Sequence, residues 1–224
     1  MTQDKTRAPA PSSSPDSKLL HTLRNPLVDK AFAVVACLPF LFLVIAYIHS
    51  NQFDFVHIVM LIQVLMQVVT MFARREPVRV TFNPLYWALA FVATYWPFLS
   101  IGLTTPGTAI APAWLADGVS LLSLAILIYA RFSLGRNIGF VPAQRRLVMD
   151  GAYAYVRHPI YTGIFIAYFG VVLARFSPLN LMLAAIGIML FMVKSLVEER
   201  FLAQDPQYQQ YMRQTRKRWI PGVA

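Results

Sequence analysis

The chain has 224 residues, of which 57% are hydrophobic and only 13% are charged, so it is far more apolar than an ordinary soluble domain. Its formal net charge is +10, which raises nucleic acid and anionic membrane surfaces as partners. The single cysteine, Cys37, excludes an intramolecular disulfide and any metal site built from several cysteines. The composition therefore predicts a membrane protein, and we expect no bound metal.

The apolar residues gather in six windows, each close to the length of about 20 residues that a helix needs to cross a bilayer. Only Ser177 and Pro178 separate the last two windows, so these are expected to form a tight helical hairpin. We predict an all-α, polytopic integral membrane bundle that forms one domain over residues 25–224, with a disordered arm before it at residues 1–24, which are rich in proline and serine. The six predicted spans are residues 31–49, 55–73, 84–104, 113–134, 160–176 and 179–197.

Lysine and arginine alternate between the connections of these spans. They occur in the N-terminal arm, after the second and fourth spans and in the C-terminal tail, whereas the connections around Gln52 and Gly107 have none and only Arg175 falls on that side. By the positive-inside rule both termini are cytoplasmic, and an even number of spans agrees with this because it places both termini on the same side. Topology and attraction to anionic lipid headgroups then explain the basic excess better than nucleic acid does. We expect a multi-pass protein of a bacterial inner membrane.

Two stretches rich in polar and aromatic residues, 145–163 and 194–222, are predicted on the cytosolic side. The hairpin brings them together, because the first stretch leads into it and the second leads out of it. Pro159 suits the first turn of a helix, where its missing N–H costs nothing. Arg157 and His158 would then lie at the mouth of that helix. Gly163, just inside, would let another backbone or a ligand come close.

The second stretch is expected to continue the last helix beyond the membrane. Lys194, Glu198 and Leu202 recur at i, i+4 and i+8, so they line one helix face. Pro206 interrupts this pattern, and a short amphipathic helix with tyrosines at i and i+3 follows it. The terminal RKRWIPG has the basic residues and tryptophan of an interfacial anchor.

Each of these features also has a plainer explanation when taken alone. Arg157 could be a topology anchor, His158 a helix-entry residue, and the tyrosines an interfacial aromatic belt. Glu198 and Glu199 could simply pair with Lys194 and nearby arginines. The joint placement of all of them at the ends of one hairpin favours a binding site.

Three motifs in the C-terminal third carry a resemblance to a known family. LVxxGxYxxxRHPxYxG runs from Leu147 to Gly163, KxxxEExxL from Lys194 to Leu202, and YxxYxxxxxxxIPG starts at Tyr208. In this spacing the chain resembles the isoprenylcysteine carboxyl methyltransferases, a family that in turn resembles membrane phospholipid N-methyltransferases. The resemblance implies transfer of the methyl group of S-adenosyl-L-methionine to a lipophilic acceptor, which is a small molecule, a lipid or a lipidated group.

The resemblance also implies residue roles in a cytosolic pocket closed by the last hairpin and the C-terminal helix. Lys194 takes the family position that contacts the acceptor, and Arg157 belongs to the RHP element. Because these two cations lie at the membrane boundary, we predict them as the catalytic residues. At Lys194 the family typically has arginine, so the chain departs from the family pattern there. The implied cofactor-binding residues are Arg145, Arg146, Leu147, Val148, Tyr153, His158, Pro159, Ile160, Tyr161 and Glu198.

The chemistry of these residue types agrees with that assignment. A sulfonium cofactor carries positive charge beside its methyl group, which favours aromatic faces such as Tyr153 and Tyr161 and a carboxylate such as Glu198. Methyl transfer is an in-line displacement that depends on positioning, and it needs neither a metal nor a general base when the acceptor is an anion. Lysine offers a point charge rather than a bidentate clamp, so Lys194 leaves room for a thiol or another nucleophile besides a carboxylate.

Two other functions remain open from the sequence. The C-terminal helices are distantly similar to those of membrane sterol reductases, which bind a nicotinamide dinucleotide. A small helical membrane scaffold would bind neither cofactor. The sequence leaves the acceptor undecided between carboxylate, thiol and amine.

Overall fold

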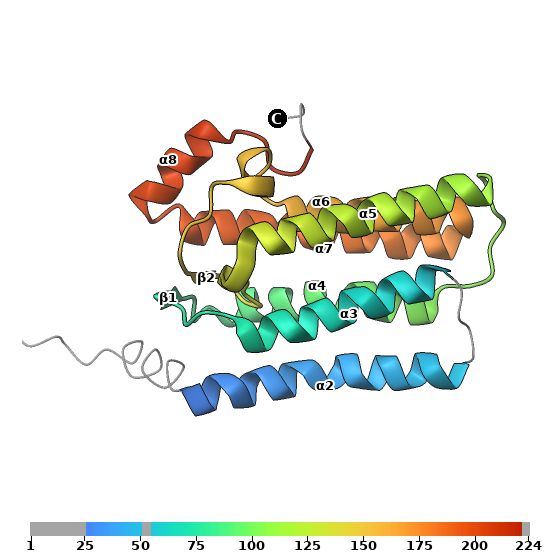
Figure 1. Cartoon of the computed structure of the whole chain (residues 1–224), viewed down its shortest axis with the longest axis horizontal. Helices are drawn as coiled ribbons and strands as arrows, with labels where there is room; N and C mark the ends of the chain where they lie inside the picture. The colour runs from blue at the N-terminus through green and yellow to red at the C-terminus, as the bar shows by residue number, and fades with distance from the viewer. Residues whose placement is uncertain (1–25, 51–54, 221–224) are drawn as a thin grey trace, which may run out of the picture.

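Long helices that run side by side form most of the protein (Figure 1). The computed structural model describes residues 26–50 and 55–220, so the predicted N-terminal arm and Gln52 lie outside the described residues. The helices are α2 (Pro26–Ser50), α3 (Phe55–Ala73), α4 (Pro84–Leu103), α5 (Ala113–Leu134), α6 (Pro159–Ala174), α7 (Pro178–Leu202) and α8 (Pro206–Gln214). Two short 3-10 helices, η1 (Gly135–Asn137) and η2 (Gly151–Ala154), and two strands, β1 (Arg79–Val80) and β2 (Ala143–Gln144), complete the fold.

Each apolar window of the sequence coincides with one helix to within a few residues, because the windows are bounded by prolines and polar residues that end helices. The prediction of a mostly helical protein is therefore confirmed. Among the described residues, the helical segments Ala113–Asn137 and Pro178–Leu202 are long and apolar enough to cross a membrane. Six spans remain a prediction.

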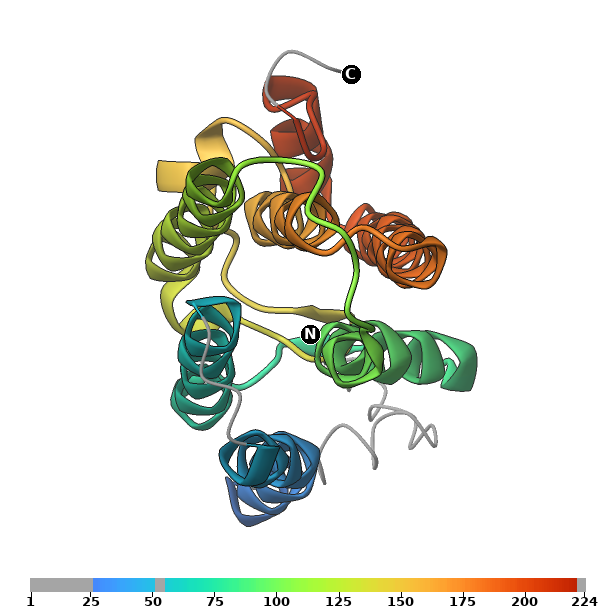
Figure 2. The ribbon, with the colours of Figure 1, turned by 90° about the vertical axis from the view of Figure 1, so that its right-hand side faces the viewer.

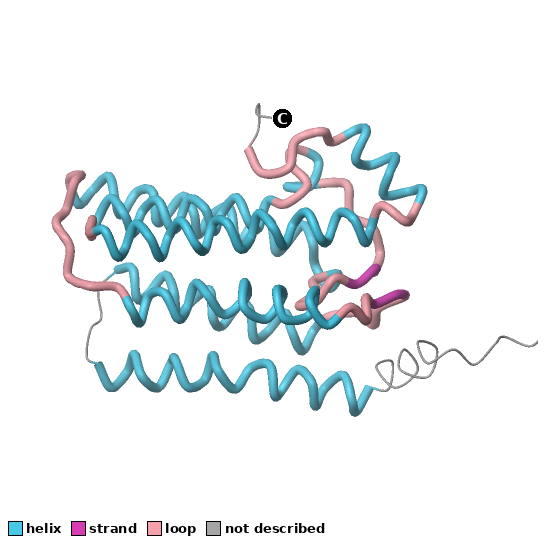
Figure 3. Tube along the Cα trace, turned by 180° about the vertical axis from the view of Figure 1, so that it is seen from behind, coloured by secondary structure: helices cyan, strands magenta, loops and turns pink. Residues whose placement is uncertain are grey.

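The helices are arranged around a common centre when the bundle is viewed along its axis (Figure 2). α5 packs against α6, α6 against α7, α7 against α4, and α3 against α5. α2 lies outside this group, against α3 and α4. Most loops and both strands gather at one end of the bundle, where α8 also lies (Figure 3).

Short contacts between loops tie the helices together at both ends. At the end that carries α8, β1 pairs antiparallel with β2, and the Arg75 amide donates to the Arg136 carbonyl at 2.7 Å. At the opposite end Thr108 and Phe176 exchange two backbone hydrogen bonds in an isolated bridge. That bridge explains why α6 ends at Ala174 instead of running on to Phe176 as predicted.

α5 and α6 approach closely because small residues face each other. A Cβ atom on Gly163 would lie 2.6 Å from Cγ of Leu127, and one on Gly170 would lie 2.9 Å from the Ser120 hydroxyl. The Ser123 hydroxyl donates to the Gly163 carbonyl at 2.8 Å. Small residues allow such close backbone contact between helices in a membrane. The close approach predicted for Gly163 is therefore present, and its partner is a helix of the same chain.

Local sequence explains where α7 and α8 begin. The Ser177 hydroxyl accepts from the Asn180 amide at 3.0 Å and Pro178 follows it, and the Asp205 carboxylate accepts from the Gln207 amide at 2.8 Å with Pro206 following. Both pairs are a capping residue followed by proline in the first turn. The tight link between α6 and α7 sets the two polar stretches of the sequence side by side at the α8 end.

Candidate active site

The start of α6 brings two aromatic rings together. His158 is the residue that caps the helix, Pro159 opens it, and Tyr161 lies one turn further on. The His158 and Tyr161 rings stack with centroids 5.2 Å apart and an interplanar angle of 4°. Residues at i and i+3 face the same way on a helix, so this stack follows directly from the sequence spacing.

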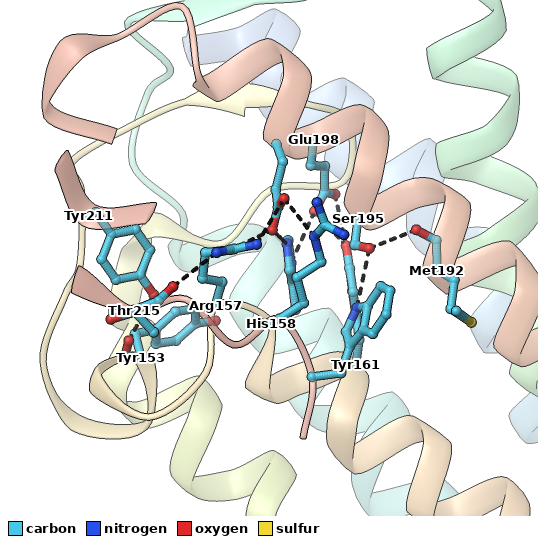
Figure 4. Close-up of polar contacts among 12 residues, drawn as sticks. Tyr153, Arg157, His158, Tyr161, Met192, Ser195, Glu198, Tyr211 and Thr215 are labelled. Carbon is cyan, nitrogen blue, oxygen red and sulfur yellow. Dashed lines mark hydrogen bonds and ion pairs between the residues drawn. The ribbon is translucent and has the colours of Figure 1, made fainter. Parts of the chain in front are cut away.

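Glu198 on α7 faces this stack (Figure 4). The Tyr161 hydroxyl lies 2.8 Å from both carboxylate oxygens of Glu198. Nδ1 of His158 and Nζ of Lys194 each lie 3.9 Å from that carboxylate, beyond hydrogen-bonding distance. Glu198 is therefore oriented by a neutral hydroxyl and has Lys194 as a longer ion-pair partner, but no cation hydrogen-bonds to it in the described part of the chain.

Glu199, the next residue, holds a separate set of partners. Arg157 donates to it from Nε at 2.7 Å and from Nη2 at 3.2 Å, and Arg218 donates from Nε at 2.9 Å. Nε2 of His158 lies 3.1 Å from the same carboxylate. Successive residues on an α-helix point about 100° apart, so the two glutamates serve different neighbours. The pairing that the sequence left open is therefore present: Glu199 pairs with two arginines, and Glu198 has Lys194 as a longer ion-pair partner at 3.9 Å.

Arg157 fastens the C-terminal segment, residues 215–219, over the start of α6. Its Nη1 donates to the carbonyls of Thr215 and Arg216, each at 3.0 Å, and its backbone amide donates to the Lys217 carbonyl at 2.9 Å. With a side chain 5% exposed, Arg157 uses its guanidinium on protein groups. This geometry favours a positioning role for Arg157 over direct contact with an acceptor.

Lys194 is the cation that faces the interior. It is 4% exposed, its Nζ donates to the Thr94 hydroxyl at 3.0 Å, and it lies 5.8 Å from the ring centroid of Tyr161 and 5.9 Å from that of Phe191. A buried ammonium with aromatic faces and one hydroxyl around it retains unused donors. The alternative that Lys194 reaches out to the headgroups does not fit this burial.

Three tyrosines close the site on the side of α8. The Tyr211 hydroxyl donates to the Tyr153 carbonyl at 2.8 Å, and the rings of Tyr208 and Tyr211 meet edge to face. Burial, and then the neighbouring Tyr211 and Glu198, raise the pKa of Tyr153 far above its ordinary value. The Tyr153 phenol is therefore neutral and available as a hydrogen-bond donor.

Most of these groups, though not Glu199 or Arg218, line one cavity of about 250 Å³. Its lining follows α7 from Asn180 to Leu202, which at roughly 1.5 Å per residue is a height of about 33 Å. Near the α8 end the walls are polar and aromatic. Deeper in the bundle they are mostly apolar and come from the four helices α4 to α7: Phe98, Leu127, Ile164, Ala167, Val171, Leu183, Ala184 and Phe191.

Most residues that the sequence predicted for the site line this cavity. They are Arg145, Arg146, Leu147, Val148, Tyr153, Arg157, His158, Ile160, Tyr161, Lys194 and Glu198. Pro159 lies outside the lining and serves to start α6. The roles assigned to all of them remain predictions.

Other lining residues were not predicted from the sequence. Asp205 and Gln144 line the polar end and are hydrogen-bonded to each other across 61 residues of chain. Asn137 and Gln63 also line the cavity, and the Oδ1 of the first and the Nε2 of the second are buried with no hydrogen-bond partner in the described part of the chain. Buried polar atoms in this state are rare and call for a ligand or water. No sequence motif marks them.

The comparison with protein families gives one match. A family model described as phospholipid methyltransferase matches residues 109–209, a little under half of the chain. This match supports a membrane methyltransferase. The matched region runs from the loop before α5 into α8 and so contains both glutamates, Arg157 and Lys194. No curated protein matches the chain.

The match agrees with the sequence motifs at the coarser level. The phospholipid methyltransferases are related to the isoprenylcysteine carboxyl methyltransferases that the motifs resemble. Membership of the narrower family remains a prediction. The match and the two long apolar helices together support a membrane protein.

Proposed function

We propose that the protein is an integral-membrane methyltransferase that uses S-adenosyl-L-methionine and acts on a lipophilic acceptor. The observation that carries the proposal is the single cavity with a polar, aromatic end near α8 and an apolar continuation between the helices. A water-soluble cofactor needs the first environment and a lipid chain needs the second. The family match over residues 109–209 supports the same reaction.

The surface of the bundle supports insertion in a bilayer with all six helices from α2 to α7 as spans and α6 and α7 as a hairpin. Large apolar side chains are exposed on the outer faces of these helices, among them Phe42 at 71%, Leu65 at 64% and Phe132 at 80%. Exposing such an apolar surface to water is unfavourable, whereas contact with lipid chains is not. The arginines after α3 and after α5 lie at the α8 end, which makes that end cytoplasmic by the positive-inside rule.

The residues present fit a sulfonium cofactor. Glu198 offers a carboxylate that is oriented by Tyr161 and not consumed by a hydrogen-bonded cation. The stacked rings of His158 and Tyr161 offer an aromatic face, and Asn137 offers an unpaired carbonyl oxygen. S-adenosyl-L-methionine would supply an electrophilic methyl group on sulfur. Glu198 and Tyr161 would hold its positive end by charge and aromatic contact.

The other residues would position the acceptor and exclude water. Lys194 and Thr94 would face the acceptor's reactive group where the polar and apolar parts of the cavity join. Arg157 would keep the C-terminal segment closed over the site through its bonds to Glu199 and to two carbonyls. Correct positioning of the two reactants lowers the free-energy barrier of an in-line transfer by several kcal/mol.

Two acceptor classes follow from different observations. The family match favours the amine of an aminophospholipid. The motifs from Leu147 to Gly163 and from Lys194 to Leu202 favour a prenylated thiol or carboxylate. A panel of these three acceptors, assayed for release of S-adenosylhomocysteine, separates the classes.

Calorimetry on purified protein in a neutral detergent tests the cofactor. We expect S-adenosylhomocysteine to bind the wild type, and we expect Glu198→Gln and Tyr161→Phe to weaken it at least about fivefold, since each removes a charge or a hydrogen bond. Tyr155→Phe is the matched control, because Tyr155 is 66% exposed. Binding of NADPH but not of S-adenosylhomocysteine would replace the proposal with a reductase, and binding of neither would leave only a scaffold.

A further inference from the structure

A row of polar side chains lies on α3 where it packs against α5. Gln63, Gln67 and Thr70 follow one another at i, i+4 and i+7, so they share one helix face. Arg131 on α5 meets this face, and it donates from Nη2 to Oε1 of Gln67 at 2.8 Å and from Nη1 to the Thr70 hydroxyl at 3.2 Å. Both helices are otherwise strongly apolar.

This row carries more hydrogen-bond donors than the protein satisfies. Gln63 and Gln67 are each only 8% exposed, and Nε2 of Gln63 has no partner within the described ranges. Arg131 has five N–H groups, of which the structure engages two. Within residues 26–50 and 55–220 no carboxylate forms an ion pair with Arg131.

An unpaired cation and an unpaired amide in an apolar bundle are costly, and such groups are rare unless they bind something. Arg131, Gln67 and Gln63 all line the cavity, so their free donors can reach a ligand there. Arg145, Arg146 and Lys194 line the same cavity and add positive charge, while Glu198 and Asp205 add negative charge near its α8 end. The N–H donors of Arg131, Gln67 and Gln63 each favour a negatively charged partner.

We propose that Arg131, Gln67 and Gln63 form an oxyanion subsite in the wall of the cavity, which takes a carboxylate or phosphate group of a bound ligand. The planar guanidinium of Arg131 is suited to two parallel hydrogen bonds with such a group. Gln67 orients the guanidinium from one side, and Gln63 adds a donor one turn deeper along α3. The subsite lies on α3 and α5, away from the glutamates of α7.

If the proposed function holds, two groups on the reactants can supply this oxyanion. One is the amino-acid carboxylate of the cofactor, and the other is an acidic group on the acceptor. The subsite itself needs neither assumption, because its chemistry is set by donors alone. The experiment therefore uses two pairs of probes that differ in the presence of an oxyanion.

The first pair is dodecyl phosphate and dodecanol, and the second is S-adenosylhomocysteine and 5′-methylthioadenosine, which lacks the carboxylate. Affinities are measured by calorimetry on purified full-length protein in a neutral detergent. The variants are Arg131→Gln and Gln63→Leu, with Arg213→Gln as a control that removes an exposed positive charge. Gln63→Leu removes a donor that has no partner among the described residues, so it tests the subsite even if Arg131→Gln fails to fold.

We expect both variants to weaken one anionic probe, by at least about tenfold for Arg131→Gln, and to leave its uncharged partner unchanged. A loss confined to dodecyl phosphate assigns the oxyanion to the acceptor, and a loss confined to S-adenosylhomocysteine assigns it to the cofactor. Equal loss for charged and uncharged probes, no loss for either, or no binding of any probe to the wild type would overturn the subsite. If dodecyl phosphate binds through Arg131 and neither nucleoside binds, the subsite stands and the proposed function fails.

Discussion

The two adjacent glutamates of α7 should respond to the same isosteric substitution in opposite ways. Glu199→Gln should lower stability strongly, because it removes the charge that Arg157, His158 and Arg218 share. Glu198→Gln should leave stability close to the wild type and weaken binding of S-adenosylhomocysteine. The contrast tests the division of roles derived from the geometry.

The magnitude follows from the burial of the partners. The side chains of Glu199 and Arg157 are 4% and 5% exposed, and breaking a buried ion pair by removing one partner costs about 3–5 kcal/mol. Glutamine keeps one acceptor oxygen, so we expect the lower end, about 3 kcal/mol. For a chain of this length that corresponds to a fall in melting temperature of about 6–12 °C. Arg218 is 39% exposed, so Arg218→Gln should cost less than about 1 kcal/mol.

Two assays in neutral detergent measure these outcomes. Tryptophan fluorescence during heating gives the melting temperature, and limited trypsin digestion follows release of the C-terminal segment, which carries the exposed Arg216 and Lys217. Glu199→Gln should be cleaved there faster than the wild type at a temperature where both remain folded. The reasoning is refuted if Glu199→Gln has the same melting temperature as the wild type, or if Glu198→Gln has a lower melting temperature than Glu199→Gln.

Three further predictions follow. Lys194→Met should raise the acceptor KM or lower kcat at least about tenfold while affinity for S-adenosylhomocysteine stays near the wild-type value, and unchanged acceptor kinetics would remove Lys194 from the acceptor site. Gly163→Val should destabilise the contact of α5 with α6 by about 1–3 kcal/mol in thermal melts, whereas Gly118→Ala, with open space around it, should be neutral or stabilising. With the single cysteine replaced by alanine, a cysteine at Ala109 should react with an impermeant thiol reagent added outside intact cells, and one at Arg146 should react only after lysis. The reverse labelling pattern would invert the topology.

The helices could be predicted from the sequence because their signals are local. Apolar windows, prolines in first turns and the capping residues Ser177 and Asp205 fix where helices begin, and all of these lie within one or two turns of chain. The pairing of His158 with Tyr161, and of Lys194 with Glu198, follows from helical spacing in the same way. The two polar stretches that supply much of the candidate site could therefore be identified from the sequence, whereas the membrane hairpin between them stays a prediction.

The parts that could not be predicted depend on contacts between distant residues. The role of Glu199 depends on Arg157, which is 42 residues away, and on carbonyls of the C-terminal segment that no sequence pattern marks. Arg131 and Gln67 are 64 residues apart and lie in different apolar windows. In the sequence Arg131 is the one basic residue of the predicted span 113–134, toward its C-terminal end. Only the packing of α3 on α5 shows that it faces the cavity.

His158 contacts both glutamates of α7: Glu199, which holds the C-terminal segment, and Glu198, which we propose binds the cofactor. Its Nε2 lies 3.1 Å from the carboxylate of Glu199, and its ring stacks on Tyr161, which in turn orients Glu198. The C-terminal segment is fastened to the same residue, because the His158 amide donates to the Arg218 carbonyl at 2.8 Å. We therefore expect a movement of that segment to shift the His158 ring, and with it the aromatic face beside Glu198. Because linked equilibria are reciprocal, a ligand that packs against this face should also hold the C-terminal segment closed, and S-adenosylhomocysteine should slow tryptic cleavage there in the wild type but not in His158→Ala.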